Sequence, residues 1–280
     1  MRKALFTLAI GDNPMYRAAL LGFERYAAKV GAELVVAKEM HYPITIENPR
    51  HTSSPAWTEK LHIGELLKDY DRVLYLDADI IVAPHAKDIF EACPALDTTY
   101  MFNEGAYLER QHVIDKIVNI MGPIDDWPTV NDRPVYYNVG CMLISRDCPL
   151  FEIATLEDLQ KLCNHIQYYE QTYFNYLLHR EGLKHEPIDA GFNRMDALGK
   201  VGYLDASFIH YAGRGYTNST LKREARFTED FAALFDGLVD GATLDEIRAA
   251  GWQLFIDKAA RRYHLPRGLA DALARRLVSI

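Results

Sequence analysis

Apolar and polar positions follow two different periods along the chain, and together they predict an α/β protein. The apolar run ALFTLAI (4–10) ends in a Gly-Asp-Asn-Pro turn, and residues 15–31 then repeat apolar side chains at helical spacing until Gly31. AELVVAKE (32–39) has the pattern of a second strand. A strand, a helix and a strand within roughly 30 residues have the size of a parallel crossover unit.

The chain continues in the same alternating order. After a loop over 41–55, WTEKLHIGELLKDY (57–70) predicts a helix and VLYL (73–76) predicts a buried strand. This order predicts a mostly parallel mixed sheet flanked by helices. Three later elements are expected: a strand over 135–146, a helix over 170–180 and a strand over 206–213.

The last part of the chain has a different character. Residues 101–134 combine one helical stretch with several Pro and Asp breaks, whereas the pattern from residue 221 onward is helical, most clearly over 244–265 and 267–280. We therefore expect a main domain over residues 1–220 and a helical C-terminal extension over residues 221–280.

Composition limits the class of protein. The chain has 280 residues, of which 49% are apolar, enough for one large core or two modest ones. It contains no run of 18 apolar residues that would span a membrane. Asp12 follows the first apolar run so closely that the start predicts a strand and not a signal peptide. The four cysteines form no C-x-x-C pair, which favours reduced thiols in a cytoplasmic protein.

Charge is distributed unevenly. The net charge of −8 argues against general nucleic-acid binding. Residues 251–280 hold six Lys and Arg against two acids, so this segment carries +4 and the remainder carries −12. A basic, amphipathic tail favours contact with acidic lipid headgroups at the inner face of a membrane, or a docking helix for a partner. A solvated helix that merely closes the domain explains the same pattern equally well.

Two carboxylates stand at the end of the strand over 73–76. Asp77 and Asp79 interrupt the apolar run VLYLDADIIV, and ligands of open α/β sheets collect at the carboxyl ends of strands. The D-x-D spacing turns both carboxylates to one side, where hard divalent cations bind oxygen ligands and leave positions for water or phosphate. Taken alone, D-x-D also occurs by chance in turns.

Four segments, in this order, resemble the GT-A glycosyltransferases, and most closely the family 8 type that includes glycogenin and the lipopolysaccharide galactosyltransferases. A short GFN segment (191–193) also resembles the family's strand before its metal-binding histidine. The resemblance covers roughly residues 1–215. The four segments are WTEKLHIGELLKDYDRVLYLDADIIV (57–82), YYNVGCMLIS (136–145), YEQTYFNYLL (169–178) and FIHYAG (208–213).

The resemblance implies a GT-A fold, a Rossmann-like α/β fold, with a nucleotide-sugar-binding catalytic domain over residues 1–220. It implies that Asp77, Asp79 and His210 bind Mn²⁺ or Mg²⁺. The positions that it implies for contacts with the donor are Ile10, Asp12, Tyr16, Lys60, Asp77, Asn138, Gly140, Gly213 and Arg214.

The resemblance also implies an activity. A sugar would move from a nucleotide-diphosphate donor, with UDP as the expected nucleotide, to a glycan or lipid-linked acceptor, as in polysaccharide biosynthesis. Retention of configuration is expected, with Gln171 and Glu170 near the reacting face of the sugar. These two residues would either stabilise a short-lived cation or act as nucleophile.

The sequence departs from the family near its end. Tyr216 stands where the family has a lysine that contacts the diphosphate, and Arg214 or Lys222 would have to supply the missing positive charge. The first turn has one Asp before Tyr16 where the family often has a pair.

Several chosen residues have an alternative structural role. His210 fits a hydrogen-bonded core histidine, Asn138 and Gly140 fit a strand with a glycine bulge, and Gln171 fits an exposed helix position. Tyr16 is equally suited to stack on a base or to cover the core.

Two other classes of function remain open. A non-catalytic module that binds sugar nucleotides would explain the missing lysine, although the Asp77, Asp79 and His210 set argues against it. A haloacid-dehalogenase-like phosphatase also has D-x-D after a strand, but that family places the motif near its N-terminus.

Overall fold

The computed structural model describes residues 1–48 and 53–279, so residues 49–52 of the loop over 41–55 and the last residue of the basic tail lie outside it. The chain divides into two compact units. We call Met1–Ile10, Ala27–Asp77 and Asp88–Ala190 the sheet unit. We call Gly11–Tyr26, Ala78–Lys87 and Gly191–Ile280 the helical unit. Helix α1 (Pro14–Val30) begins in the helical unit and ends in the sheet unit.

The sheet unit contains a six-stranded sheet in which only one strand runs against the others. β1 pairs in parallel with β2 and β3, β5 pairs in parallel with β9, and β8 is antiparallel to both β3 and β5. The predicted mostly parallel mixed sheet is therefore confirmed. In spatial order the strands are β2 (Ala32–Ala37), β1 (Lys3–Leu8), β3 (Arg72–Leu76), β8 (Tyr137–Ser145), β5 (Thr99–Asn103) and β9 (His185–Pro187).

The contact between β5 and β8 contains an irregularity that matters for the site. Met101 faces Met142, but Phe102 faces Asn138 and Asn103 faces Tyr137, so the register shifts between Met101 and Phe102. A shift of this kind bends the strand and re-aims the side chains beyond it.

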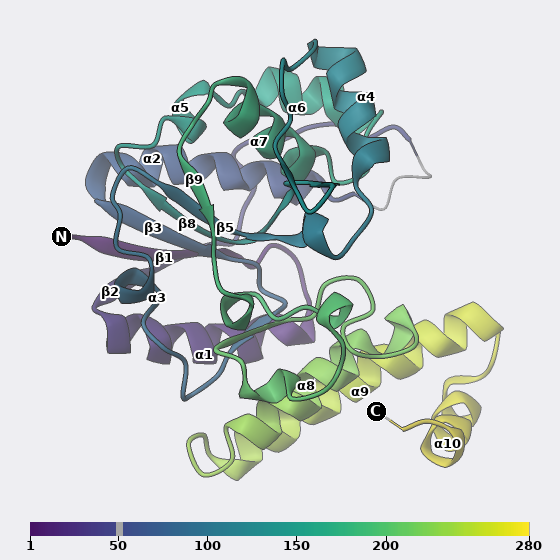
Figure 1. Ribbon diagram of the computed structural model, residues 1–280. Coiled ribbons are helices and arrows are strands. Elements are labelled where there is room, and N and C mark those ends of the chain that lie inside the picture. Colours follow the sequence, from purple (N-terminus) through teal and green to yellow (C-terminus); the bar gives the residue numbers. More distant parts are fainter. Residues whose placement is uncertain (49–52, 280) are drawn as a thin grey trace. The chain divides into compact units, whose positions relative to one another are not determined.

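Five helices of the sheet unit gather over one face of its sheet, and the short α3 (Ile89–Ala92) is not among them (Figure 1). Their apolar faces form one core with the sheet; α7 is the most buried, since every side chain from Tyr169 to His179 is withdrawn from solvent. Gln171 is consequently not an exposed helix residue. The helices are α2 (His62–Asp69), α4 (Gln111–Met121), α5 (Leu150–Ile153), α6 (Leu156–Cys163) and α7 (Tyr169–Arg180).

The predicted helix over 57–70 is divided in two. A 3₁₀ helix, η1 (Pro55–Leu61), precedes α2. The Ser54 side chain caps η1 at its start, and the Thr58 hydroxyl donates to carbonyl oxygens of Pro55 and Tyr42, which holds the tighter first turns. The division matters because Lys60 lies in η1, with its side chain in the interior.

The helical unit contains a two-stranded antiparallel ribbon, most of α1, and the helices α8, α9 and α10. β4 (Ile80–Val82) pairs with β10 (Phe208–His210), a shorter strand than the one predicted over 206–213. α9 (Gly241–Tyr263) packs against α8 (Arg223–Leu234) and against α10 (Arg267–Leu277). Within residues 1–48 and 53–279, no helix combines the length and apolar character that crossing a membrane requires.

Candidate metal and donor site

The site begins where β3 ends. All five residues of β3 are buried, and the next residue, Asp77, donates its backbone N–H to the carbonyl oxygen of Gly140 at 2.8 Å. The Asp77 carboxylate accepts a hydrogen bond from Tyr75 Oη at 2.5 Å and lies 3.6 Å from Lys60 Nζ. Asp77 is thus held from both its backbone and its side chain at the carboxyl end of a buried strand.

The pairing of β4 with β10 places His210 beside Asp79. His210 is the register partner of Ile80, and the N–H of Tyr211 donates to the carbonyl oxygen of Asp79 at 2.9 Å. His210 Nε2 lies 3.2 Å from Asp79 Oδ1. Residues 131 positions apart in the sequence therefore become neighbours because two three-residue strands pair.

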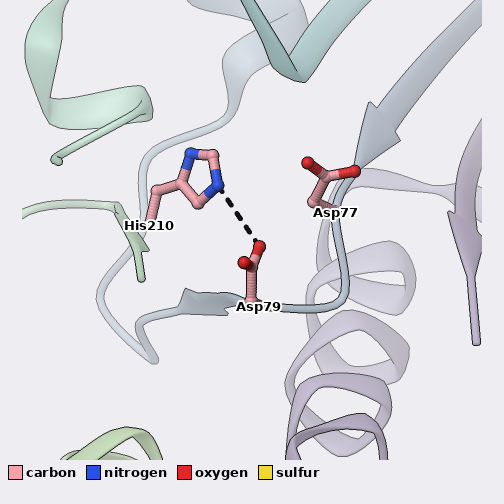
Figure 2. Close-up of side chains that lie close together, drawn as sticks. All are labelled: Asp77, Asp79 and His210. Atoms are coloured by element: carbon pink, nitrogen blue, oxygen red, sulfur yellow. Dashed lines mark ion pairs between the residues drawn. The ribbon is translucent and has the colours of Figure 1, made fainter. Parts of the chain in front are cut away.

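Asp77, Asp79 and His210 form a group that could hold a metal ion. Each offers one ligand atom, and these atoms lie within 4.8 Å of one another. Figure 2 shows the imidazole and the carboxylates turned toward one another, with the Asp79–His210 ion pair as a dashed line. Two carboxylates and one imidazole are a donor set suited to Mn²⁺ or Mg²⁺.

The hydrogen bonds of His210 fit a metal ligand. His210 Nδ1 lies 2.8 Å from Asn193 Oδ1, an oxygen that can only accept, so Nδ1 carries the proton and Nε2 of the neutral ring presents a lone pair. Nε2 faces Asp79 Oδ1, which is buried and accepts no hydrogen bond from the described residues. The lone pairs of His210 Nε2 and Asp79 Oδ1 face each other, which favours a cation between them. In addition, metal-binding histidines commonly donate their second ring N–H to an oxygen, as His210 does to Asn193.

Asp79 also lies beside a cation. Burial alone would raise the pKa of Asp79. When no cation lies between the two side chains, a protonated His210 and then Arg223 outweigh burial and lower this pKa to about 2. Arg223 Nη1 lies 3.5 Å from Asp79 Oδ2. Gly215, at φ +53°, makes room for this arginine, because a Cβ there would lie 2.7 Å from Arg223 Cγ. The carboxylate is therefore ionised at neutral pH and has positive charge beside it.

Lys60 and Glu170 form a buried ion pair in the sheet unit. Lys60 Nζ lies 3.1 Å from Glu170 Oε1 and 3.3 Å from the carbonyl oxygen of Val139, and only 1% of Lys60 and 4% of Glu170 are exposed. Burial raises the pKa of Glu170, and Lys60 opposes that shift. Lys60 also approaches Asp77, so one ammonium group joins a predicted catalytic residue to a predicted metal ligand.

Asn138 and Gln171 contact each other within β8 and α7. Gln171 Oε1 lies 3.2 Å from Asn138 Nδ2 and 3.3 Å from the N–H of Val139. Both amide nitrogens donate to Glu104, and Asn138 Oδ1 accepts the N–H of Gly140 at 3.0 Å. The glycine segment of β8 is therefore held by side-chain hydrogen bonds as well as by its strand partners.

The other predicted donor residues lie in turns, except Tyr16. Ile10 and Asp12 lie in the turn after β1, where Gly11 has a positive φ of 90°, and Tyr16 lies in the first turn of α1. Gly213, with φ +61°, and the exposed Arg214 follow β10. Loops at the ends of strands are the ordinary place for ligand-binding residues in this class of fold.

Tyr216 is part of the core of the helical unit. Its ring stacks on Tyr203 at 4.0 Å between centroids, and its hydroxyl donates to the carbonyl oxygen of Arg194. Lys222 lines a groove between α9 and α10. The cation beside Asp79 is thus Arg223, and neither the Tyr216 position nor Lys222 contributes the contact.

Sequence reasoning missed two residues of the site. Glu104 follows β5. Its contacts depend on the shifted register between β5 and β8, and no local pattern in the sequence predicts that shift. Arg223 opens α8 and reaches Asp79 only because of the turn at Gly215. The available signal for Arg223 was its position next to Lys222, in the segment where the sequence already required a positive charge.

Comparisons with known proteins agree with this architecture. No protein-family model matches the chain, and no curated protein matches it at a significant level. Among solved structures, the chain is similar to a glycosyltransferase involved in the glycosylation of the major capsid of PBCV-1, with 16% identity and a TM-score of 0.53 over 81% of this chain and 99% of that one. It is also similar to the galactosyltransferase LgtC in complex with donor and acceptor sugar analogues, with 16% identity and a TM-score of 0.53 over 84% and 100% of the two chains.

A third structure extends the comparison. The bifunctional glycosyltransferase WbbM shows 14% identity and a TM-score of 0.54, with 89% of this chain and 51% of that chain covered. These likenesses show that the chain has the GT-A fold, as the sequence predicted. With identities of 14–16%, they establish the fold, and the activity has to be argued from the residues themselves.

Proposed function

We propose that this protein is a metal-dependent glycosyltransferase that transfers a sugar from a nucleotide-diphosphate donor, UDP being the expected nucleotide. The observation that carries the proposal is the Asp77, Asp79 and His210 group, with ligand atoms within 4.8 Å of one another, on a GT-A fold. LgtC, which shares this fold, was crystallised with donor and acceptor sugar analogues, which supports the same class of substrates here.

The chemistry requires charge at the leaving group. Asp77, Asp79 and His210 would hold a divalent cation, which would supply positive charge where the departing diphosphate gains negative charge. Arg223 and Arg214 add permanent cations on the segment that follows β10, in place of the lysine that Tyr216 replaces. In this proposal, Ile10 and Asp12 in the turn after β1, and Tyr16 at the start of α1, contact the base and ribose.

The sugar ring would face the buried polar groups of α7 and β8. Glu170 and Gln171 lie at the start of α7, fixed by Lys60 and by Asn138 respectively. Both side chains are almost completely buried, and Gln171 contacts Val139 of β8. This placement supports a reaction on the face of the sugar that turns toward α7, in keeping with retention of configuration. Gln171 offers an amide oxygen that stabilises developing positive charge without forming an ion pair in the ground state.

We further propose that a lipid-linked or other glycan acceptor is used at a membrane surface, where the C-terminal extension over 221–280 provides contact. α10 exposes Leu269, Leu273 and Leu277 at intervals of four residues. Four cations of residues 221–280 make no ion pair with an acid among the described residues, so their charge is available to acidic headgroups. They are Lys222, Arg261, Arg262 and Arg276.

Flotation with vesicles tests this contact. The wild type should float with vesicles that contain about a third of anionic lipid and remain unbound with neutral vesicles. The reason is that each basic residue contributes about 1 kcal/mol of binding near an anionic surface, and this contribution is missing on a neutral one. Leu273→Asp should abolish flotation, whereas Val201→Asp, at an exposed apolar residue of the same unit, should leave it unchanged. Equal flotation on both kinds of vesicle, or on neither, contradicts the proposed surface.

The central proposal is tested by thermal shift with UDP, GDP, CDP, ADP and TDP, each with and without Mn²⁺. One nucleotide should stabilise the wild type only when Mn²⁺ is present, and a ligand at 100 times its Kd stabilises by about 2.7 kcal/mol. Asp79→Asn should lose the shift. Asp245→Asn, which removes one carboxylate from an exposed surface ion pair, is the matched control and should keep it.

Turnover separates this proposal from its alternatives. A glycosyltransferase slowly hydrolyses the nucleotide sugar that stabilises it, a binding module shows the shift without hydrolysis, and a phosphatase releases phosphate from small esters. A nucleotide shift that survives in Asp79→Asn, or one that needs no metal, would contradict the proposed site.

A further inference from the structure

Glu104 is a buried carboxylate that neither the sequence pattern nor the family resemblance selects. It follows β5 in the sheet unit, and only 1% of it is exposed. Burial of an ionised carboxylate is costly unless several donors surround it, so a carboxylate in this place needs an explanation.

Three donors converge on Glu104. Arg110 Nε lies 2.7 Å and Gln171 Nε2 2.8 Å from Oε1, and Asn138 Nδ2 lies 3.0 Å from Oε2. The Arg110 guanidinium is itself placed by two aromatic rings, 5.3 Å from the centroid of Tyr168 and 5.8 Å from that of Tyr136. The negative charge is therefore compensated, and every partner is a donor.

The backbone on both sides of Glu104 is fixed. Asn103 Oδ1 accepts the N–H of Tyr136 at 3.1 Å, and the N–H of Gly105 donates to the carbonyl oxygen of Tyr136 at 2.9 Å. Gly105 has no room for a side chain, because a Cβ would lie 2.2 Å from the carbonyl oxygen of Pro134. Glu104 consequently points into the interior from a segment that cannot turn away.

An amide side chain can be rotated by half a turn with little change in shape, so its orientation depends on its hydrogen-bond partners. A carboxylate accepts and never donates, and it therefore draws the nitrogen of Gln171 toward itself. The oxygen of Gln171 is then left facing the N–H of Val139, at 3.3 Å, and Asn138 Nδ2. The same argument turns Asn138 Oδ1 toward the N–H of Gly140.

We propose that Glu104 is a positioning residue that fixes the orientation of the Gln171 amide, and with it the oxygen that Gln171 presents at the start of α7. The part of this proposal that concerns catalysis depends on the glycosyltransferase function proposed above, whereas the part that concerns orientation does not. Glu104 acts through Gln171 and Asn138 and does not contact the substrate itself.

The orientation is tested by amide hydrogen exchange in Glu104→Gln. A glutamine at 104 presents either an oxygen or a nitrogen, so the Gln171 amide is no longer held in one orientation and the Val139 N–H loses its acceptor for part of the time. Exchange at Val139 should accelerate at least about tenfold relative to Leu143, which lies in the same strand β8. General destabilisation would accelerate both amides by the same factor.

A matched control is available in the helical unit. Asp230 is also a buried carboxylate that accepts from three donors: Tyr203, Tyr211 and Arg226. Asp230→Asn should leave the ratio of exchange at Val139 and Leu143 unchanged. An unchanged ratio in Glu104→Gln, or equal acceleration at both amides, would overturn the proposal.

The catalytic consequence is read from the split between kcat and KM for donor hydrolysis. Glu104→Gln should lower kcat about 10- to 100-fold, because misplacement of a reacting group by about 1 Å costs this much, and should leave donor KM within about twofold. Selective exchange at Val139 with an unchanged kcat would overturn the catalytic part alone. If the wild type has neither donor turnover nor a nucleotide shift, the proposed function fails, and the exchange ratio still decides the role of Glu104.

Discussion

The ammonium group of Lys60 lies 3.1 Å from the carboxylate of Glu170, and both side chains are almost completely withdrawn from solvent. Each charge is buried only because the other is present. The pair joins η1 to α7, two segments that lie 110 residues apart in the sequence, so it holds one side of the proposed donor site as well as the core.

Removal of one partner of this pair should be strongly destabilising. Lys60→Met leaves Glu170 buried without its cation, and breaking such a pair typically costs about 3–5 kcal/mol. Chemical denaturation measures the change. Lys60→Met combined with Glu170→Gln should recover most of the loss, because no uncompensated charge then remains.

The control is an exposed lysine. Lys68 pairs with Glu65 on the surface of α2, with 69% of its side chain exposed, and Lys68→Met should change the free energy of unfolding by less than about 0.5 kcal/mol. A similar small effect for Lys60→Met would mean that Glu170 is not ionised in the folded protein.

Acid should destabilise the sheet unit through His179. Burial and then His185 lower the pKa of His179, to about 4, although the carbonyl oxygen of Val135, which accepts from Nε2, opposes the shift. The unfolded chain, with an ordinary histidine pKa near 6.5, binds the proton first. The contribution of His179 to stability is therefore complete above about pH 6.5 and is lost as the pH falls toward 4.

Denaturation at pH 7, 6, 5 and 4.5 measures this dependence. A difference of one pKa unit corresponds to about 1.4 kcal/mol, so His179→Gln should remove up to about 3 kcal/mol of the loss between neutral pH and pH 4. Glutamine keeps a donor for Val135 but takes up no proton. His112→Gln, at an exposed position of α4, should leave the wild-type dependence intact, and an unchanged slope in His179→Gln would contradict the argument.

Gly251 should not tolerate a side chain. It lies in α9 against α8, and a Cβ there would be 2.0 Å from Thr228 Oγ1 and 3.0 Å from the carbonyl oxygen of Glu224. Gly251→Ala should destabilise by about 1–3 kcal/mol in thermal or chemical unfolding, since the two helices have to move apart.

The same contact predicts partial rescue. Thr228→Ala removes the two nearest atoms, so the double variant should lose less stability than the sum of the single ones. Gly268→Ala in α10 is the control: nothing lies within 4 Å of its Cβ, and the change should stabilise by about 0.5–1 kcal/mol. If the losses of stability from Gly251→Ala and Thr228→Ala are fully additive, the cost of Gly251→Ala does not come from the clash with Thr228.

Restoring the family's lysine should not improve donor binding. Tyr216 is buried between aromatic rings and has φ +63°, so Tyr216→Lys would bury an ammonium group in an apolar place. We expect a loss of at least about 2 kcal/mol in stability and no gain in the nucleotide-dependent thermal shift. Tyr216→Phe removes only the bond to Arg194 and should cost about 1 kcal/mol, and tighter nucleotide binding by Tyr216→Lys would contradict the burial argument.

The sequence predicted the parts of this protein that depend on local patterns. The strand before Asp77 is continuously apolar and ends in carboxylates, and α7 has a helical pattern, so both could be identified without the structure. Because the motifs occur in the same order as in the glycosyltransferase family, the resemblance also selected His210 as a predicted metal ligand.

The remainder depends on contacts between distant segments. β9 has three residues and no apolar run of its own, and β5 places Glu104 correctly only because its register with β8 shifts after Met101. Similarly, Arg223 reaches Asp79 because a glycine turn at 215 leaves space for it. Local periodicity carries no information about such pairings.

The register between β5 and β8 also bears on how this protein could diversify. The chain leaves the sheet at Asn103 and returns at Tyr137, and these two residues face each other across the ladder. α4 is anchored in the core by Val113 and Ile117, but residues 122–134 between α4 and β8 are largely exposed. Insertions or exchanges in that stretch would begin and end at positions fixed by the sheet, so substrate preference could be altered by loop grafting without disturbing Asn138 or the carboxylates that are proposed to bind metal.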